Sequence, residues 1–194
     1  MKLILASSNP GKLSEIRSLL NGSGYEIINQ TELGIGDAIE NGSSFTENAL
    51  IKARHASVHS GFAALADDSG LEVDYLEGKP GIYSARFAGL NATDGDNIRK
   101  LLTDLEDVPE EQRTARFHCV IAMVLNSSDD HPTLCHGIWE GRILDHCCGD
   151  NGFGYDPVFY VPEFGCTSAS LDPAVKNTHS HRARALNKLS DHLL

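Results

Sequence analysis

The chain has 194 residues, with 27 acidic and 16 basic side chains and a formal net charge of −11. This length favours one domain, whose core buries roughly 70% of the surface of the unfolded chain without the help of disulfide bonds. The acidic balance repels polyanions at long range, which argues against a nucleic-acid polymer as partner. A small phosphorylated ligand stays compatible with this charge if basic groups or a metal ion gather locally.

The cysteines and the N-terminal segment are typical of a protein of the reducing cytosol. The five cysteines are odd in number, and Cys147 and Cys148 are adjacent, which fits neither a disulfide framework nor a Cys-x-x-Cys pair. Residues 1–7 run directly into a strand-like segment, and no apolar stretch reaches the roughly 18 residues that a membrane span needs. We therefore expect a soluble, cytoplasmic protein without a membrane partner.

The first third of the chain contains two predicted strands and two predicted helices. Residues 3–6 form an apolar run typical of a buried strand, and a turn at residues 7–11 leads into a helix that ends at Asn21-Gly22. Apolar side chains at helical spacing predict a second helix over residues 44–59. A short apolar run predicts the next strand over residues 62–66.

The rest of the chain contains further elements of both kinds. Alternating apolar and acidic residues predict a half-buried strand over residues 71–75, and residues 94–105 predict a helix. Two long strand-like runs, residues 115–125 and 133–144, are joined by a polar loop suited to an antiparallel pair. A glycine-rich loop, a short strand near residues 158–161 and an amphipathic C-terminal helix follow. The mixture predicts an α/β fold with a mixed sheet, and neither a repeat nor a linker marks a second independent domain.

The motif Ala66-Asp67-Asp68-Ser69-Gly70 places two adjacent carboxylates where the predicted strand ends. Adjacent side chains of an extended backbone point to opposite faces, so both carboxylates reach one point only if the chain turns at Ser69-Gly70. Carboxylates at such a position can hold a metal ion, and one of them can take a proton from water. A solvated turn is the alternative interpretation, because Asp, Ser and Gly are preferred turn residues.

A second motif, Ser7-Ser8-Asn9-Pro10-Gly11-Lys12, lies between the first strand and the first helix. A helix N-terminus offers free N–H groups and about half a positive charge, which suits a phosphate, and Lys12 adds a full charge. The loop lacks the second glycine of a Walker A motif, so a helix cap with a turn is the alternative. On the second helix Asn48 and Lys52 are four residues apart and share a face, which is either part of a site or solvated surface.

Three further segments carry side chains suited to a nucleotide. Arg86 closes the turn-rich segment 78–86 and can bind a phosphate or form a structural salt bridge. The loop Gly152-Phe153-Gly154-Tyr155-Asp156-Pro157 exposes two aromatic rings on a flexible backbone, as a site that stacks a planar base does. Lys176 and Ser180-His181-Arg182 lie at the approach to the C-terminal helix, where they either contact a base or phosphate or charge the first turn of that helix.

In this order the motifs resemble the inosine triphosphate pyrophosphatase family, and in particular its bacterial dITP/XTP pyrophosphatase type. The resemblance covers nearly the whole chain, from the Ser-x-Asn-x-x-Lys motif to Ser-His-Arg. It implies hydrolysis of dITP, ITP and XTP to the nucleoside monophosphate and pyrophosphate, with Mg²⁺ as cofactor, which would clean the nucleotide pool. It also implies a single bilobed domain over residues 1–194, with a long mixed sheet flanked by helices, a central nucleotide cleft and a homodimeric assembly.

The resemblance further implies a set of site residues. Asp68 is expected to be the proton acceptor and a metal ligand, and Glu40 to be a second metal ligand. The residues expected to bind the substrate are Ser7, Ser8, Asn9, Pro10, Gly11, Lys12, Lys52, Ser69, Phe153, Gly154, Tyr155, Asp156, Lys176, His181 and Arg182. Phe153 would stack on the base. Ser7-Ser8 stands where many relatives carry Thr-Gly, which leaves this loop stiffer but keeps a hydroxyl.

Other functions are weaker matches to the sequence. A phosphomonoesterase with an aspartate nucleophile typically needs Asp-x-Asp, so that both carboxylates share one face, whereas Asp67 and Asp68 are adjacent. A nucleotide sensor would hold the same ligand without hydrolysing it, and it does not require a complete set of base, metal ligand and lysines. A zinc site at Cys135-His136 or at residues 146–148 is disfavoured, because neither spacing lets several ligands converge.

Overall fold

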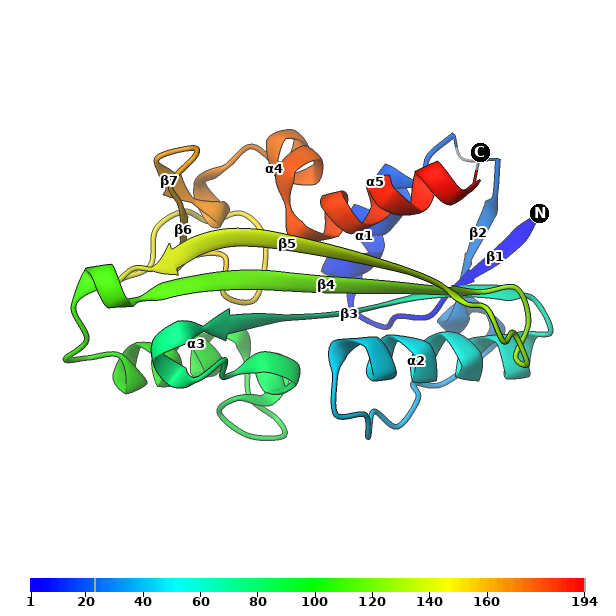
Figure 1. Ribbon diagram of the computed structural model, residues 1–194, viewed down its shortest axis with the longest axis horizontal. Helices are drawn as coiled ribbons and strands as arrows, with labels where there is room; N and C mark the ends of the chain where they lie inside the picture. Colours follow the sequence, from blue (N-terminus) through cyan, green and yellow to red (C-terminus); the bar gives the residue numbers. More distant parts are fainter. Residues whose placement is uncertain (23, 194) are drawn as a thin grey trace. The chain divides into compact units, whose positions relative to one another are not determined.

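The computed structural model describes residues 1–22 and 24–193, so residues 23 and 194 of the predicted domain 1–194 lie outside the described residues (Figure 1). The strands are β1 (Lys2–Leu5), β2 (Glu26–Asn29), β3 (Ala63–Val73), β4 (Thr114–Val124), β5 (Thr133–Ile143), β6 (Phe159–Val161) and β7 (Cys166–Thr167). The α-helices are α1 (Pro10–Leu19), α2 (Phe45–Ser60), α3 (Asp94–Asp104), α4 (Pro173–His179) and α5 (His181–Leu193). Within the described residues, none of the helices is both long enough and apolar enough to cross a membrane.

The seven strands form one sheet in the order β2-β1-β3-β4-β5-β6-β7. Strand β1 pairs in parallel with β2 and β3, whereas β6 pairs antiparallel with β5 and β7. The sheet is therefore mixed, and the α/β class predicted from the sequence is confirmed. The sequence pattern does not predict β2, β7 or α4, which have four, two and seven residues.

The chain forms two compact units that share its long strands. Unit 1 comprises residues 1–68, 119–137 and 181–194, and unit 2 comprises residues 69–118 and 138–180. In unit 1 helices cover both faces of the sheet, with α1 and α5 on one face and α2 on the other (Figure 1). Leu65 packs with Ile16 of α1 and Leu186 of α5, while the adjacent Ala64 packs with Ala53 of α2. Because successive side chains of β3 point to opposite faces of the sheet, they pack alternately against α1 and α5 or against α2.

Strand β3 continues through the acidic motif without interruption, from Ala63 to Val73. The prediction of separate strands over residues 62–66 and 71–75 is wrong. The strand is interior to the sheet, and its pairing overrides the turn preference of Ser69-Gly70. Asp67 and Asp68 are 1% and 6% exposed, so a solvated turn is excluded as well.

Unit 2 has its own hydrophobic core, in which β3, β4, β5 and β6 pack with α3. Its largest buried side chains include Trp139 of β5 and Phe159 of β6, which lie beside Leu71 of β3 and Leu101 of α3. The predicted helix over residues 94–105 and the predicted strands 115–125 and 133–144 agree with α3, β4 and β5 to within a residue at each end.

Candidate functional site

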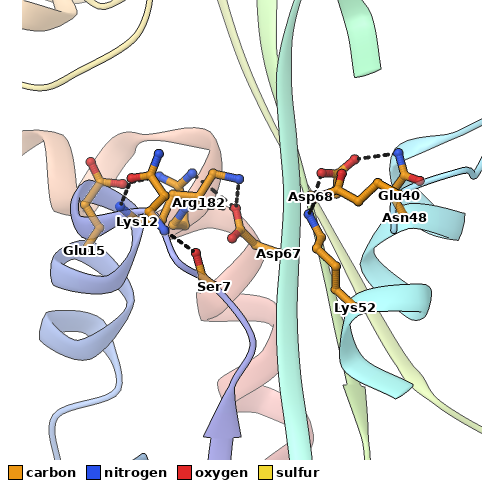
Figure 2. Close-up of polar contacts among 10 residues, drawn as sticks. Ser7, Lys12, Glu15, Glu40, Asn48, Lys52, Asp67, Asp68 and Arg182 are labelled. Atoms are coloured by element: carbon orange, nitrogen blue, oxygen red, sulfur yellow. Dashed lines mark hydrogen bonds and ion pairs between the residues drawn. The ribbon is translucent and has the colours of Figure 1, made fainter. Parts of the chain in front are cut away.

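Asp67 and Asp68 point to opposite faces of β3 and have different partners (Figure 2). On the face of α1 and α5, Asp67 Oδ2 lies 3.1 Å from Lys12 Nζ and 3.2 Å from the guanidinium of Arg182. On the face of α2, Asp68 Oδ1 lies 2.7 Å from Lys52 Nζ. The strand therefore gives two sequence neighbours two separate electrostatic surroundings.

On the α2 face one ammonium group joins two carboxylates. Lys52 Nζ lies 2.7 Å from Asp68 and 3.3 Å from Oε1 of Glu40, and Asn48 Nδ2 lies 3.4 Å from the other oxygen of Asp68. Burial raises the pKa of Asp68, and the charges of Lys52 and Lys12 offset only part of this effect. Burial also acts to lower the pKa of Lys52, but the surrounding carboxylates, with Asp68 first, raise it above its ordinary value. Asp68 is thus a stronger base than an exposed aspartate, beside a lysine that stays charged.

On the opposite face a fully buried arginine links α5 to α1 and β3. Arg182 is 1% exposed, and its guanidinium forms ion pairs with Asp67 and with Glu15 of α1. Burial alone would lower the pKa of Arg182, yet these two carboxylates outweigh burial and raise it. Because the guanidinium is paired with these carboxylates, Arg182 orients Asp67. Asp67 in turn orients the ammonium of Lys12. His181, the first residue of α5, is 5% exposed.

The loop before α1 is a helix cap. Asn9 Oδ1 accepts a hydrogen bond from the backbone N–H of Lys12, and Pro10 occupies the first turn, where its missing N–H has no consequence. Ser7 Oγ accepts from the N–H of Asn9 at 3.3 Å, and Ser8 Oγ donates to Asp37 at 2.8 Å. The cap also brings the ammonium of Lys12 to Asp67, so the helix start and the acidic motif form one cluster.

In unit 2 the glycine-rich loop is held by one buried carboxylate. Asp156 is 2% exposed; its Oδ2 accepts from the N–H of Phe153 at 2.8 Å and from Lys176 Nζ at 2.7 Å, and its Oδ1 accepts from Ser168 Oγ. The ammonium of Lys176 also lies 5.0 Å from the centre of the Phe153 ring. A side chain at Gly152, which has φ +80°, would place its Cβ 2.1 Å from Asp156 Oδ2. A flexible backbone is expected here from the sequence; in the structure, hydrogen bonds to Asp156 hold the loop in place.

Two further contacts hold this loop from outside. The N–H of Gly154 donates to Asp94 of α3 at 2.7 Å, and the hydroxyl of Tyr155 donates to the carbonyl of Ser84 at 2.8 Å. Tyr155 is 4% exposed, and burial raises the pKa of its phenol. Of the two aromatic rings predicted to be exposed, only that of Phe153 is partly accessible, and the prediction for Tyr155 is wrong. Ser69, which follows Asp68 along β3, is partly accessible as well.

The residues on the α2 face fit a magnesium ion. Among the side chains that the structure describes, no three His, Cys, Asp or Glu residues lie close enough together to form a metal centre of their own. Asp68 and Glu40 nevertheless converge on the ammonium of Lys52. One or two carboxylates, completed by water and substrate phosphates, are the usual protein contribution to a Mg²⁺ site.

Sequence reasoning does not find the partners that complete these clusters. Glu15 pairs with Arg182 across 167 positions, and Asp94 meets Gly154 across 60. Neither acid belongs to a motif. The sequence offers one general indication: an arginine that becomes buried, such as Arg182, needs an acidic partner somewhere in the fold.

Comparisons with known proteins agree with the resemblance inferred from the motifs. The Ham1 family model matches residues 3–192. Proteins named dITP/XTP pyrophosphatase from Vibrio vulnificus and Photobacterium profundum are 55% and 56% identical over 188 residues, which are 97% of this chain and 94% and 95% of theirs. The solved structure of a HAM1 protein from Coxiella burnetii is 50% identical with a TM-score of 0.93, over 100% of this chain and 98% of that one. With a matching family model and relatives of this identity along nearly its full length, the chain belongs to the Ham1 family.

Proposed function

We propose that this chain hydrolyses dITP, ITP and XTP to the nucleoside monophosphate and pyrophosphate and so removes non-standard purines from the nucleotide pool. The family and the names of the relatives confirm the sequence-based prediction of a nucleoside triphosphate pyrophosphatase. The observation that carries the proposal is the Asp67-Asp68 pair on one buried strand, with a lysine on each face. This arrangement places a carboxylate that can act as a base next to ammonium groups that can contact phosphates.

Asp68 is the proposed proton acceptor. Its carboxylate lies in a buried setting that raises its pKa, which strengthens it as a base while an ordinary aspartate would be a weak one. Asp68 takes a proton from the water that attacks the α-phosphorus. The bond from the α-phosphorus to its bridging oxygen then breaks, and pyrophosphate leaves with the electron pair.

An acidic chain can bind a polyanion only if lysines and a bound metal ion neutralise the phosphate charge at the site. A triphosphate brings about four negative charges, and the ammonium groups of Lys12 and Lys52 lie beside Asp67 and Asp68. We propose that Asp68 and Glu40 hold Mg²⁺, which would neutralise phosphate charge and polarise water when bound. The loop of residues 7–12 is proposed to contact the phosphates.

Unit 2 supplies the groups suited to a purine base. Phe153 presents a partly accessible ring on a loop that hydrogen bonds of Asp156 hold in place, and this ring is proposed to stack on the base. Discrimination against adenine is proposed to come from hydrogen bonds to the 6-keto edge, since a site built for such a group rejects an analogue without it by roughly 10⁴. Assembly as a homodimer is a further proposal that rests on the resemblance alone. A cytoplasmic location is proposed from the cysteine pattern and the N-terminal segment.

The test is pyrophosphate release with Mg²⁺ from a panel of ITP, dITP, XTP, GTP, ATP and dTTP. We expect turnover of the first three, and we expect Asp68→Asn to abolish it while nucleotide binding survives. Inorganic phosphate as the product would favour the phosphomonoesterase, although the opposite orientations of Asp67 and Asp68 do not form the shared carboxylate face which that class needs. Intact bound triphosphate would favour the sensor.

A further inference from the structure

The segment that leads into α2 is tied to the helix by side chains of its first turns. The N–H of Gly42 donates to Asn48 Oδ1 at 2.9 Å. The N–H and Oγ of Ser43 donate to Glu47 Oε2 at 2.6 and 2.8 Å. Glu40, two residues before Gly42, reaches Lys52 from this segment. The position of Glu40 therefore depends on how the segment is held against α2.

The hydrogen bond from the N–H of Gly42 fixes the orientation of the Asn48 side chain. The residue is 1% exposed, and a backbone N–H can only be met by the oxygen of its amide. The NH₂ group must then face the other way, where it lies 3.4 Å from Asp68 Oδ2. This distance is long, as hydrogen bonds of catalytic groups often are before the substrate is bound.

Gly42 shows how closely the segment approaches the helix. A Cβ at this position would lie 2.7 Å from Asn48 Oδ1 and 2.7 Å from Glu47 Cβ. The side chain of Asn48 thus lies between the backbone of Gly42 and the carboxylate of Asp68, and it leaves no room for a side chain at Gly42.

We propose that Asn48 is a positioning residue, which orients the carboxylate of Asp68 with its NH₂ group and holds the segment of Glu40 with its carbonyl oxygen. This inference rests on the proposed pyrophosphatase activity. The contacts of Asn48 are with Gly42 and with the carboxylate of Asp68, so we expect its loss to lower kcat and to leave KM nearly unchanged. A displacement of about 1 Å in a catalytic group can reduce turnover by roughly 100-fold.

Two variants separate the two contacts. Asn48→Ala removes both, whereas Asn48→Asp keeps an acceptor for Gly42 and replaces the donor to Asp68 by a carboxylate. We expect both to lower kcat about 10- to 100-fold with KM within about threefold. Exchange of the Gly42 amide hydrogen, measured without nucleotide, should become roughly five- to tenfold faster in Asn48→Ala and stay unchanged in Asn48→Asp. Asn187→Ala, on the exposed side of α5, is the matched control and should alter neither quantity.

The outcomes distinguish this inference from the proposed function. A wild-type protein that releases no pyrophosphate from any purine triphosphate refutes the function, whatever the variants do. If the wild type is active, an Asn48 variant that keeps kcat within twofold, or unchanged Gly42 exchange in Asn48→Ala, overturns the positioning role. Gly42→Ala perturbs the same hydrogen bond, because its Cβ would displace the Asn48 side chain, and it should lower kcat too. This variant keeps the inference testable if an Asn48 variant fails to fold.

Discussion

Replacing Asp67 or Asp68 by asparagine should have different effects on stability, although the two residues are adjacent. Asp67 has a side chain with no exposed surface, and its Oδ2 is the partner of both Lys12 and Arg182. Asp67→Asn keeps the shape but removes the charge, which leaves the buried guanidinium with Glu15 as its carboxylate partner. Breaking a buried ion pair from one side costs about 3–5 kcal/mol. Because Glu15 remains, we expect the lower end of that range, about 3 kcal/mol.

Asp68→Asn should leave stability unchanged or slightly raised. Burial raises the pKa of Asp68, so its ionised form is less favourable in the folded protein than in the unfolded chain. Ionised Asp68 therefore lowers stability at all pH values above its folded pKa, and a neutral amide removes this penalty. The loss of its contact with Lys52 is moderated by Glu40, which stays beside the ammonium.

The assay is thermal unfolding of both variants at pH 7, with urea unfolding as a second probe. For a chain of this length 1 kcal/mol corresponds to about 2–4 °C in Tm, so Asp67→Asn should lower Tm by roughly 6–12 °C. Asp68→Asn should stay within about 2 °C of the wild type or rise, although it loses turnover. Equal losses of Tm in the two variants, or a larger loss in Asp68→Asn, would refute the division of roles argued from the two faces of β3.

Three further outcomes follow from the same geometry. Because burial raises the pKa of Asp68, kcat/KM should fall with decreasing pH through an inflection above the ordinary aspartate value of 3.8, and a pH profile with its inflection at or below that value contradicts the assignment. Gly152→Ala should raise KM for dITP at least about tenfold, since its Cβ would displace Asp156 from the N–H of Phe153; steady-state kinetics check this, and an unchanged KM would count against the loop as the base site. Asp94→Ala removes the acceptor of the Gly154 N–H, so amide exchange at Gly154 should become roughly five- to tenfold faster; unchanged exchange would show that Asp94 does not hold the loop.

Much of the architecture follows from local patterns. Helical spacing predicts α1, α2, α3 and α5, and long apolar runs predict β4 and β5, because hydrophobic periodicity and helix caps depend on neighbouring residues alone. The period of two along an extended chain also predicts that Asp67 and Asp68 point apart, which the structure confirms. The order of the motifs predicts the family, because each motif consists of neighbouring residues and needs no tertiary structure to be recognised.

Only the tertiary structure decided what the two aspartates meet. Ser69-Gly70 has the composition of a turn, yet it lies within β3, because the pairing of an interior strand depends on distant segments. Two acidic partners of Arg182, Asp67 and Glu15, lie 115 and 167 positions away, and no pattern near Arg182 indicates them. The sequence by itself therefore indicated which side chains are candidates for the chemistry. The packing of α1, α2 and α5 on β3 decided that Asp68 is buried beside Lys52 with a raised pKa and that Asp67 is the counter-ion of Lys12 and Arg182, since burial and ion pairing depend on what the fold places opposite each carboxylate.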